Sequence, residues 1–321
     1  MIKVLFMGTP EFAVPALQAI HSTSSMQVLA VYTQPDRPAG RGLGQKAPPV
    51  KTKAQELGFP VFQPTKLSGK DKNTEAKELE NLKSLNPDVI VVVAYGEILR
   101  NDLIAVPRLG CINIHSSLLP RWRGAAPIQW AILNGDKETG VTTMRISEKL
   151  DAGDILLQAK LEIGPKETAQ SLHDRLSQKG AQLIVPTLEG IAAGTINPIK
   201  QDESKVTFAP KLTKDMEWLD PAEDARLLDR KIRALNPWPG TSVIIEGMGR
   251  LRILQAEPVD SIQGREATIF EKAGMLLIAT KQGSLRLSRI QLDGKKPVNE
   301  AQFLNGLKGQ GKDLPLTIKK P

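Results

Sequence analysis

The sequence predicts an α/β fold, with a doubly wound, mostly parallel sheet in a first domain and a small β-barrel in a second. Strand-like apolar runs alternate with helix-like segments through the first part of the chain. The run over 88–95, DVIVVVAY, is continuously apolar, as in a strand that is buried on both faces of a parallel sheet. In the last third, short β-type runs follow one another at the spacing of a small barrel.

The domain boundaries follow from length and composition. A chain of 321 residues is long enough for two domains. Residues 192–205 are polar and irregular, which is typical of a linker. We therefore expect a first domain over 1–190, a linker over 191–206 and the β-barrel domain over 207–321.

The first domain is expected to open with a strand over 3–7 and a helix that Thr9 caps and Pro10 begins. A dinucleotide-binding fold would carry the pattern G-x-G-x-x-G at this turn, and the sequence GTPE over 8–11 does not. The missing glycines argue against a nicotinamide-dependent dehydrogenase. The elements expected after this turn are strands over 28–33 and 60–63, a helix over 75–85, strands over 88–95 and 111–115, a helix over 126–133, strands over 140–147 and 155–163, and a helix over 168–188.

The strands over 140–147 and 155–163 are expected to form a hairpin at an end of the sheet. In the second domain, a helix over 222–235 is followed by NPWPG, a sequence that ends it. The β-type runs of this domain lie over 242–246, 251–257, 274–279 and 284–292, and the tail over 308–321 is basic.

Positive charge is concentrated in the last third of the chain. The protein has 43 basic and 35 acidic residues, a net charge of +8, and residues 230–321 contain 16 basic and 8 acidic residues. The first 229 residues therefore hold 27 of each and carry no net charge. This asymmetry indicates a polyanion as the partner of the second domain. A basic surface that only aids solubility is the alternative.

Composition also excludes several classes of protein. No apolar run approaches the roughly 20 residues that a membrane helix needs. The N-terminal apolar run is short and has no small-residue cleavage site behind it, so we interpret it as a strand and not as a signal peptide. A single cysteine excludes an internal disulfide and an all-cysteine metal site. We therefore expect a protein of the reducing cytoplasm.

A basic, glycine-rich segment over 34–51, QPDRPAGRGLGQKAPPVK, interrupts the first domain. A loop of this length inside a compact domain is usually functional or disordered. We interpret it as a loop that grips a phosphate-rich or otherwise large substrate, and a plain surface insertion is the alternative. Its charged residues are Arg37, Arg41, Lys46, Lys51 and one acid, Asp36.

The most informative stretch is 110–127, GCINIHSSLLPRWRGAAP. Asn113 and His115 are two residues apart in a strand, so their side chains point to the same side. A carboxamide and an imidazole at a strand end indicate proton transfer beside a developing oxyanion. Tyr95 ends another strand, and sites in open α/β sheets lie beyond such ends. A core histidine with satisfied hydrogen bonds is the alternative interpretation.

Two further residues bear on this site. Asp151 lies on the loop between two strands, where an acid can reach toward His115. Cys111 as a nucleophile is a separate hypothesis, but this cysteine has no obvious base, and we prefer a small apolar role in the sheet. His173 and Asp174, on the predicted helix over 168–188, are interpreted as structural.

Together these motifs resemble the family of formyltransferases that use 10-formyltetrahydrofolate. The resemblance rests on Asn113-x-His115, SLLP over 117–120 and LDAG over 150–153. Longer runs resemble those family members whose formyl acceptor is an aminoacyl-tRNA, and the similarity spans both domains. These runs are MGTPEFAVPAL over 7–17, QPDRPAGRG over 34–42, AYGEIL over 94–99, SSLLPRWRGAAPIQWAI over 116–132 and NPWPG over 236–240.

The resemblance implies a reaction. The α-amino group of methionyl initiator tRNA attacks the formyl carbon of 10-formyltetrahydrofolate, tetrahydrofolate leaves, and N-formylmethionyl-tRNA is formed for translation initiation. Asn113 would donate a hydrogen bond to the oxyanion, His115 would help move the proton, and Asp151 would orient His115. No metal is required.

The resemblance also implies a fold and a set of binding residues. The first domain would be the family's Rossmann-like formyltransferase domain, and the barrel would be of the oligonucleotide-binding (OB) type and hold tRNA through its phosphates. The residues that would line the folate site are Ser117, Leu118, Leu119 and Pro120, with Tyr95 in the wall of the pterin pocket.

In the same interpretation, the insertion over 34–50 would contact the acceptor end of the tRNA. Arg41 is the leading candidate for that contact, with Arg37 and Lys46 beside it. A monomer would suit a protein that wraps one large substrate. The sequence assigns no role to Arg121, Trp122 or Arg123.

Three alternatives stay open beside this interpretation. Glycinamide ribonucleotide formyltransferases share the Asn-x-His pair and the distant Asp, but they are shorter and lack a basic second domain. Sugar-nucleotide formyltransferases and the hydrolase part of formyltetrahydrofolate dehydrogenase do carry a second domain, and the charge asymmetry favours tRNA over them. A tRNA-binding protein without chemistry comes from another class, and the intact Asn113, His115 and Asp151 argue against it.

Overall fold

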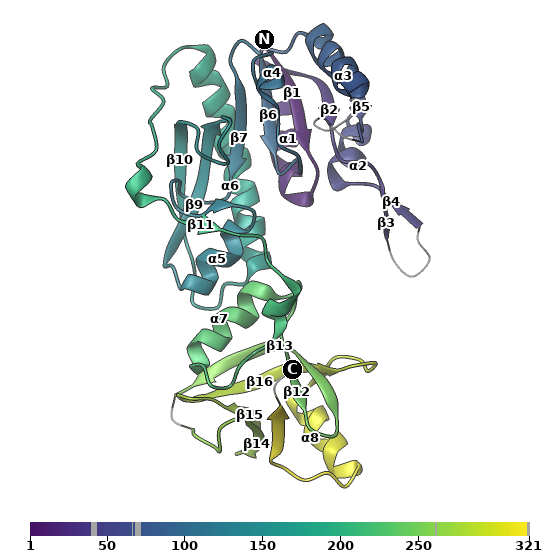
Figure 1. Ribbon diagram of the computed structural model, residues 1–321, viewed down its shortest axis with the longest axis vertical. Helices are drawn as coiled ribbons and strands as arrows, with labels where there is room; N and C mark the ends of the chain where they lie inside the picture. The colour runs from purple at the N-terminus through teal and green to yellow at the C-terminus, as the bar shows by residue number, and fades with distance from the viewer. Residues whose placement is uncertain (40–43, 66, 68–71, 261, 320–321) are drawn as a thin grey trace. The chain divides into compact units, whose positions relative to one another are not determined.

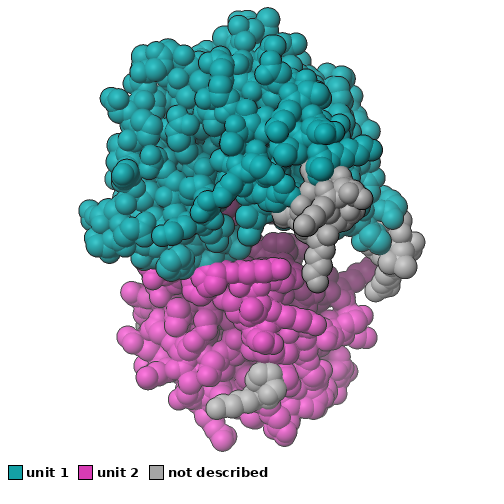
Figure 2. Space-filling view, turned by 45° about the horizontal axis from the view of Figure 1, so that its top comes forward, with its two compact units in different colours: residues 1–127, 138–162, 173–209 teal, residues 128–137, 163–172, 210–321 magenta. Residues whose placement is uncertain are grey.

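The computed structural model describes residues 1–39, 44–65, 67, 72–260 and 262–319. The chain forms two compact units, which Figure 2 colours separately. Unit 1 comprises residues 1–127, 138–162 and 173–209, and unit 2 comprises residues 128–137, 163–172 and 210–321. No helix in the described ranges is long and apolar enough to cross a membrane.

Unit 1 is built on a mostly parallel sheet, as predicted. Its strand order is β10-β9-β7-β6-β1-β2-β5. The inner strands and β5 run parallel, whereas β9 and β10 form an antiparallel hairpin at one end of the sheet. The strands are β1 (Ile2–Gly8), β2 (Met26–Tyr32), β5 (Val61–Phe62), β6 (Val89–Val93), β7 (Cys111–His115), β9 (Glu138–Arg145) and β10 (Ile155–Glu162).

Helices cover both faces of this sheet (Figure 1). On one face, Leu5 and Ile90 of neighbouring strands pack in one cluster with Leu82 of α3 and Leu103 of α4. On the other face, α1 and α6 lie side by side and together line a groove. The helices and 3-10 turns of unit 1 are η1 (Glu11–Ala13), α1 (Val14–His21), α2 (Pro49–Glu56), α3 (Lys72–Leu85), α4 (Asn101–Ile104), most of α6 (Ala169–Ala192) and η2 (Glu203–Lys205). Helix α5 (Pro127–Asn134) belongs to unit 2 from Ile128 onward.

The segment over 34–51 was predicted as a single loop, and that prediction is wrong in part. Strands β3 (Arg37–Ala39) and β4 (Gly44–Lys46) form an antiparallel hairpin that projects from unit 1 (Figure 1), and α2 begins at Pro49. Proline is well suited to the first turn of a helix because it lacks the N–H that would stay unpaired there. The polar composition of α2, in which only Val50 and Ala54 are buried, hides its helical pattern.

Unit 2 contains the predicted β-barrel. Its strand order is β13-β12-β18-β14-β15-β16-β17, and β13 also pairs with β16, so the antiparallel sheet closes on itself. Apolar side chains of the strands fill the interior together with those of α7 and α8. The elements are η3 (Lys214–Glu217), α7 (Ala225–Leu235), β12 (Ser242–Ile245), β13 (Gly249–Val259), β14 (Thr268–Lys272), β15 (Met275–Ala279), β16 (Ser284–Leu292), β17 (Val298–Asn299), α8 (Glu300–Gly309) and β18 (Leu316–Lys319).

Five described elements of unit 2 are absent from the sequence prediction: η3, β14, β17, α8 and β18. The strands β14 and β18 are short, and β18 lies in the tail that was described only as basic. Helix α8 contains two glycines, which lower its helix propensity. The spacing of Asn299 and Gln302 could have predicted where α8 begins. The two residues form a capping box, in which each side chain hydrogen-bonds to the backbone N–H of the other.

A short parallel pairing completes unit 1. Strand β8 (Arg123–Gly124), just beyond β7, pairs with β11 (Phe208–Ala209). At Gly124 the two backbones approach so closely that a Cβ atom would lie 2.7 Å from the carbonyl oxygen of Ala209. The residues that follow α6 are therefore bound to the turn that follows β7.

Candidate functional site

Strand β7 presents two polar side chains on one face. Cys111, at its start, lies on the face covered by α3 and α4, with Sγ 3.7 Å from the carbonyl oxygen of Ile104. Because side chains alternate along a strand, Asn113 and His115 share that face, as predicted. His115 is only 6 % exposed. Asn113 is half-buried, and its amide makes no hydrogen bond to any other residue that the structure describes, so its donors are free for a ligand.

The imidazole of His115 is held between a carbonyl and a carboxylate. Its Nε2 lies 2.9 Å from the backbone oxygen of Trp122. A carbonyl oxygen only accepts, so Nε2 carries the hydrogen of this bond. Its Nδ1 faces Oδ2 of Asp151 at 3.7 Å, too long for a direct hydrogen bond. In the neutral ring Nδ1 therefore carries the free lone pair, beside a negative charge.

Asp151 is brought to His115 by an unusual backbone conformation. Its φ of 49° lies in the left-handed region that non-glycine residues rarely adopt. Its Oδ2 also accepts a 2.8 Å hydrogen bond from the backbone N–H of Gly124. Such strain concentrates at functional sites, where the surrounding structure over-determines the conformation. The structure thus brings the predicted acid and histidine together.

The turn that follows β7 is braced by residues that sequence reasoning missed. The backbone N–H of Trp122 donates to Thr207 Oγ1 at 2.9 Å, and the N–H of Arg123 donates to the Thr207 carbonyl at 2.9 Å. The guanidinium of Arg123 is buried and pairs with Glu203 at 2.8 Å. Arg123 therefore braces the site, whereas Arg121 stacks on the ring of Trp122. No spacing in the sequence points to Thr207 or Glu203.

The predicted folate segment is fixed mainly by its backbone. Ser117 Oγ donates to the carbonyl of Arg121 at 2.6 Å, and the N–H of Leu119 donates to Thr142 Oγ1 at 3.1 Å. The side chains of Ser117 and Leu119 are buried, and those of Leu118 and Pro120 are half-buried. Leu118 and Pro120 are thus the parts of this segment that a ligand could reach.

Tyr95 lies where the carboxyl ends of β6 and β1 meet. Strands β6 and β7 are parallel neighbours, so the ends near Tyr95 and His115 lie side by side, as expected. The phenol of Tyr95 is 1 % exposed, and burial raises its pKa well above the usual range. Its carbonyl accepts a 2.8 Å hydrogen bond from Thr9 Oγ1. The buried phenol is therefore not a group that this residue offers to a ligand.

The hairpin β3–β4 carries two of the three predicted tRNA contacts. Arg37 and Lys46 are both exposed and stand directly opposite each other in the hairpin register. Lys51 is not available for a phosphate, because it pairs with Asp36 at 2.7 Å. Arg41, the leading candidate, lies outside the described residues.

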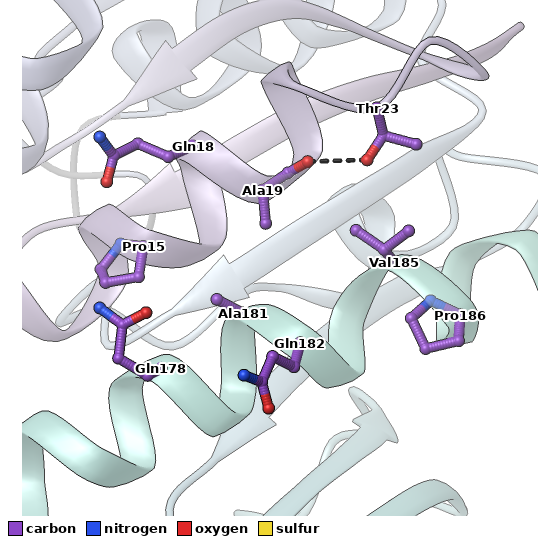
Figure 3. A pocket seen from close by; sticks show the side chains of 9 residues that line it. All are labelled: Pro15, Gln18, Ala19, Thr23, Gln178, Ala181, Gln182, Val185 and Pro186. Atoms are coloured by element: carbon purple, nitrogen blue, oxygen red, sulfur yellow. Dashed lines mark hydrogen bonds between the residues drawn. The ribbon is translucent and has the colours of Figure 1, made fainter.

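A groove of about 500 Å³ lies elsewhere on unit 1, between α1 and α6. Figure 3 shows the side chains of Pro15 and Gln18 from α1 facing those of Gln178 and Gln182 from α6. None of the side chains that line this groove is acidic or basic: they are amides, apolar groups and one hydroxyl, which do not titrate near neutral pH. We therefore place the chemistry at the end of β7 and not in this groove.

Comparison with known proteins identifies the family. The formyl transferase family matches residues 2–188, and its C-terminal domain matches residues 211–308. The methionyl-tRNA formyltransferase of Methylococcus capsulatus is 48% identical over 98% of this chain and 99% of its own length. That of Halorhodospira halophila is 46% identical over 95% of this chain and 96% of its own.

Solved structures show the same fold at low sequence identity. An N-formyltransferase from Helicobacter canadensis, in complex with folinic acid and dTDP-3-aminofucose, has a TM-score of 0.67 at 19% identity, over 89% of this chain and 99% of that one. HypX from Aquifex aeolicus, in complex with tetrahydrofolic acid, has a TM-score of 0.60 at 19% identity, over 95% of this chain and 47% of that one. With both of its domains matched and relatives similar over their full length, the chain belongs to the formyl transferase family.

Proposed function

We propose that the protein transfers the formyl group of 10-formyltetrahydrofolate to the α-amino group of methionyl initiator tRNA. The observation that carries this proposal is the cluster of Asn113, His115 and Asp151 at the carboxyl end of β7, in a chain whose full-length relatives are methionyl-tRNA formyltransferases. The product, N-formylmethionyl-tRNA, serves translation initiation.

The reaction needs an oxyanion donor and a proton carrier. The α-amino nitrogen forms a bond to the formyl carbon, and the formyl oxygen becomes an oxyanion. Asn113, whose amide is free, donates a hydrogen bond to that oxygen. His115 takes up the proton that the amine loses, at Nδ1, where Asp151 stabilises the imidazolium. The bond from the formyl carbon to N10 then breaks, and the proton passes to N10 of tetrahydrofolate.

For the folate side of the site, we propose the segment over 117–120 and the strand end at Tyr95. The hydrogen bonds of Ser117 and Leu119 keep this backbone in one conformation, which lowers the entropic cost of binding. Leu118 and Pro120, the half-buried residues of the segment, would supply apolar contact to the pterin.

For the tRNA side, the hairpin β3–β4 supplies a cation pair. Like charges directly opposite each other destabilise a hairpin, and a phosphate bound between Arg37 and Lys46 would relieve that repulsion. Asp36 does not neutralise them, because it is held by Gln63 at 2.8 Å and by Lys51. These hydrogen bonds keep the pKa of Asp36 below its usual range, so it stays charged and paired. Arg41, which lies outside the described residues, belongs to the same proposed contact with tRNA.

The acceptor assay tests the proposal. Purified protein, 10-formyltetrahydrofolate and charged initiator tRNA should give formylmethionyl-tRNA, and uncharged tRNA should give none. The competing acceptors are an amino-sugar nucleotide and glycinamide ribonucleotide. Faster formylation of either one than of methionyl-tRNA would refute the proposed acceptor but keep the formyl transfer.

We further propose a monomer that acts in the cytoplasm, where initiator tRNA is charged. One large substrate for each chain needs no second copy, and the buried thiol of Cys111 suits a reducing compartment. Sedimentation at working concentrations tests the first point: a dimer that persists on dilution would contradict it.

A further inference from the structure

Gln201 lies in the segment between α6 and η2 and reaches back to the loop of Asp151. Its Nε2 donates to the carbonyl oxygens of Asp151 and Gly153, both at 2.8 Å. Its Oε1 accepts a 3.0 Å hydrogen bond from Nε of the buried Arg123. One half-buried amide therefore joins the turn after β7 to the loop that carries the acid.

The orientation of this amide is unambiguous. Backbone carbonyls only accept and a guanidinium only donates, so a single arrangement of the amide oxygen and nitrogen satisfies all three contacts. Arg123 also forms an ion pair with Glu203, and its N–H fixes which end of the Gln201 amide faces the turn after β7. Both N–H groups of the Gln201 amide and one lone pair of its oxygen are therefore used in contacts at the site.

Gln201 binds the loop of Asp151 at the residues where the loop backbone is strained. Asp151 has a left-handed φ of 49°, which is sterically unfavourable for a non-glycine residue. On its other side the loop is fixed by close approach, since a Cβ atom at Gly153 would lie 1.8 Å from the carbonyl oxygen of Arg145. Hydrogen bonds to the carbonyls of Asp151 and Gly153 hold the peptide planes that this conformation requires.

We propose that Gln201 is a positioning residue for Asp151, and that it keeps the carboxylate facing His115 Nδ1. The inference rests on the proposed formyl transfer. It adds a residue outside the strand-end motif to the machinery of the reaction. Gln201 touches neither substrate; it acts through the backbone of the residue whose Oδ2 lies 3.7 Å from the imidazole.

A purely structural role would look different. In that case Gln201 would only fasten its own segment to unit 1 through Arg123. Gln201→Glu separates the two roles. A carboxylate keeps the shape and strengthens the contact to Arg123, but it cannot donate to the carbonyls of Asp151 and Gly153 and repels them.

The experiment compares Gln201→Glu with Gln178→Glu in the full-length protein. We expect Gln201→Glu to lower kcat for methionyl-tRNA on the order of tenfold to hundredfold, with both KM values and the thermal unfolding midpoint near those of wild type. Gln178→Glu makes the same change at an exposed glutamine of α6, in the groove away from the site, and it should keep the wild-type kcat.

A double-mutant cycle with Asp151→Asn completes the test. If Gln201 acts through Asp151, Gln201→Glu should change kcat by less than about twofold in the Asp151→Asn background. An equal loss in both backgrounds, or a wild-type kcat in Gln201→Glu, would overturn the inference. If the Glu variant does not fold, Gln201→Met is measured by the same criteria. A wild-type protein that formylates no methionyl-tRNA would instead refute the proposed function.

Discussion

Nδ1 of His115 lies 3.7 Å from Oδ2 of Asp151, although 36 positions separate the two residues in the sequence. The same oxygen accepts the N–H of Gly124, and the other ring nitrogen of His115 is bound to the carbonyl of Trp122. Both partners are thus oriented by the backbone of the turn that follows β7. An imidazolium formed here is stabilised by a carboxylate that needs little rearrangement to meet it.

Removing the imidazole should abolish most of the rate. We expect His115→Ala to lower kcat on the order of 100- to 10,000-fold, because proton transfer loses its carrier. Single-turnover formylation with quantified folate binding is the measurement. His21→Ala is the control, since His21 is exposed at the end of α1, where its ring contacts Phe59. Full activity in His115→Ala would exclude the assigned role.

Asn113 should matter for the transition state more than for binding. We expect Asn113→Ala to lower kcat on the order of 100- to 1,000-fold with little change in KM, because the amide donates to an oxyanion that the ground state lacks. Steady-state kinetics with both substrates varied distinguishes the two effects. A rise in KM at constant kcat would mean that the amide binds substrate uniformly.

The hairpin should contribute to tRNA affinity through charge. We expect Arg37→Ala and Lys46→Ala each to weaken tRNA binding and to flatten its dependence on salt by about one counterion. Lys51→Ala is an informative comparison, because Lys51 is already paired with Asp36. Binding of tRNA is measured from low to moderate salt, with folate affinity as the control. A salt dependence identical to wild type in both variants would contradict the phosphate contact.

Cys111 should be chemically silent in the folded protein. Burial raises the pKa of its thiol to about 12, so the reactive thiolate is nearly absent near neutral pH. We expect iodoacetamide at pH 8 to label the protein in urea but not in buffer, as followed by mass. Cys111→Ala should keep its kcat. Loss of transfer in that variant would reopen the hypothesis of a cysteine nucleophile.

The stability of unit 2 should depend on pH through Glu300. Hydrogen bonding to Arg286 lowers the pKa of Glu300 below its usual 4.5, so the folded state favours the charged form. The resulting stabilisation is present above about pH 4.5 and is lost as the pH falls through the lowered pKa. We expect Glu300→Gln to lower the free energy of unfolding by about 0.5–1 kcal/mol at pH 7.

Urea unfolding of the full chain at pH 7 and in acid measures this difference. It should be largest at pH 7 and shrink in acid, where Glu300 is neutral in both states. Glu271→Gln, an exposed acid on β14, is the matched control and should change little at either pH. A difference that does not depend on pH would show that Glu300 contributes through packing and not through its charge.

Local patterns were enough to predict most elements of the fold. The continuous apolar run at 89–93 marks a strand buried on both faces, and alternation places Asn113 and His115 on one face of β7. Apolar runs and alternation depend only on residues close in sequence, so they predict an element without knowledge of the rest of the chain. They fail for α2 and α8, whose polar or glycine-containing sequences become helices only where the fold offers a surface to pack on.

The sequence by itself identified the groups that we propose for the chemistry: a carboxamide, an imidazole and an acid, within a family whose motifs it carries in order. Only the tertiary structure decided how these groups are held. The hydrogen bond from Gln201 to the carbonyl of Asp151 joins residues 50 positions apart in the sequence. The hydrogen bond from Trp122 to Thr207 joins residues 85 positions apart. No local spacing encodes such contacts, because they exist only after the sheet has brought distant turns together.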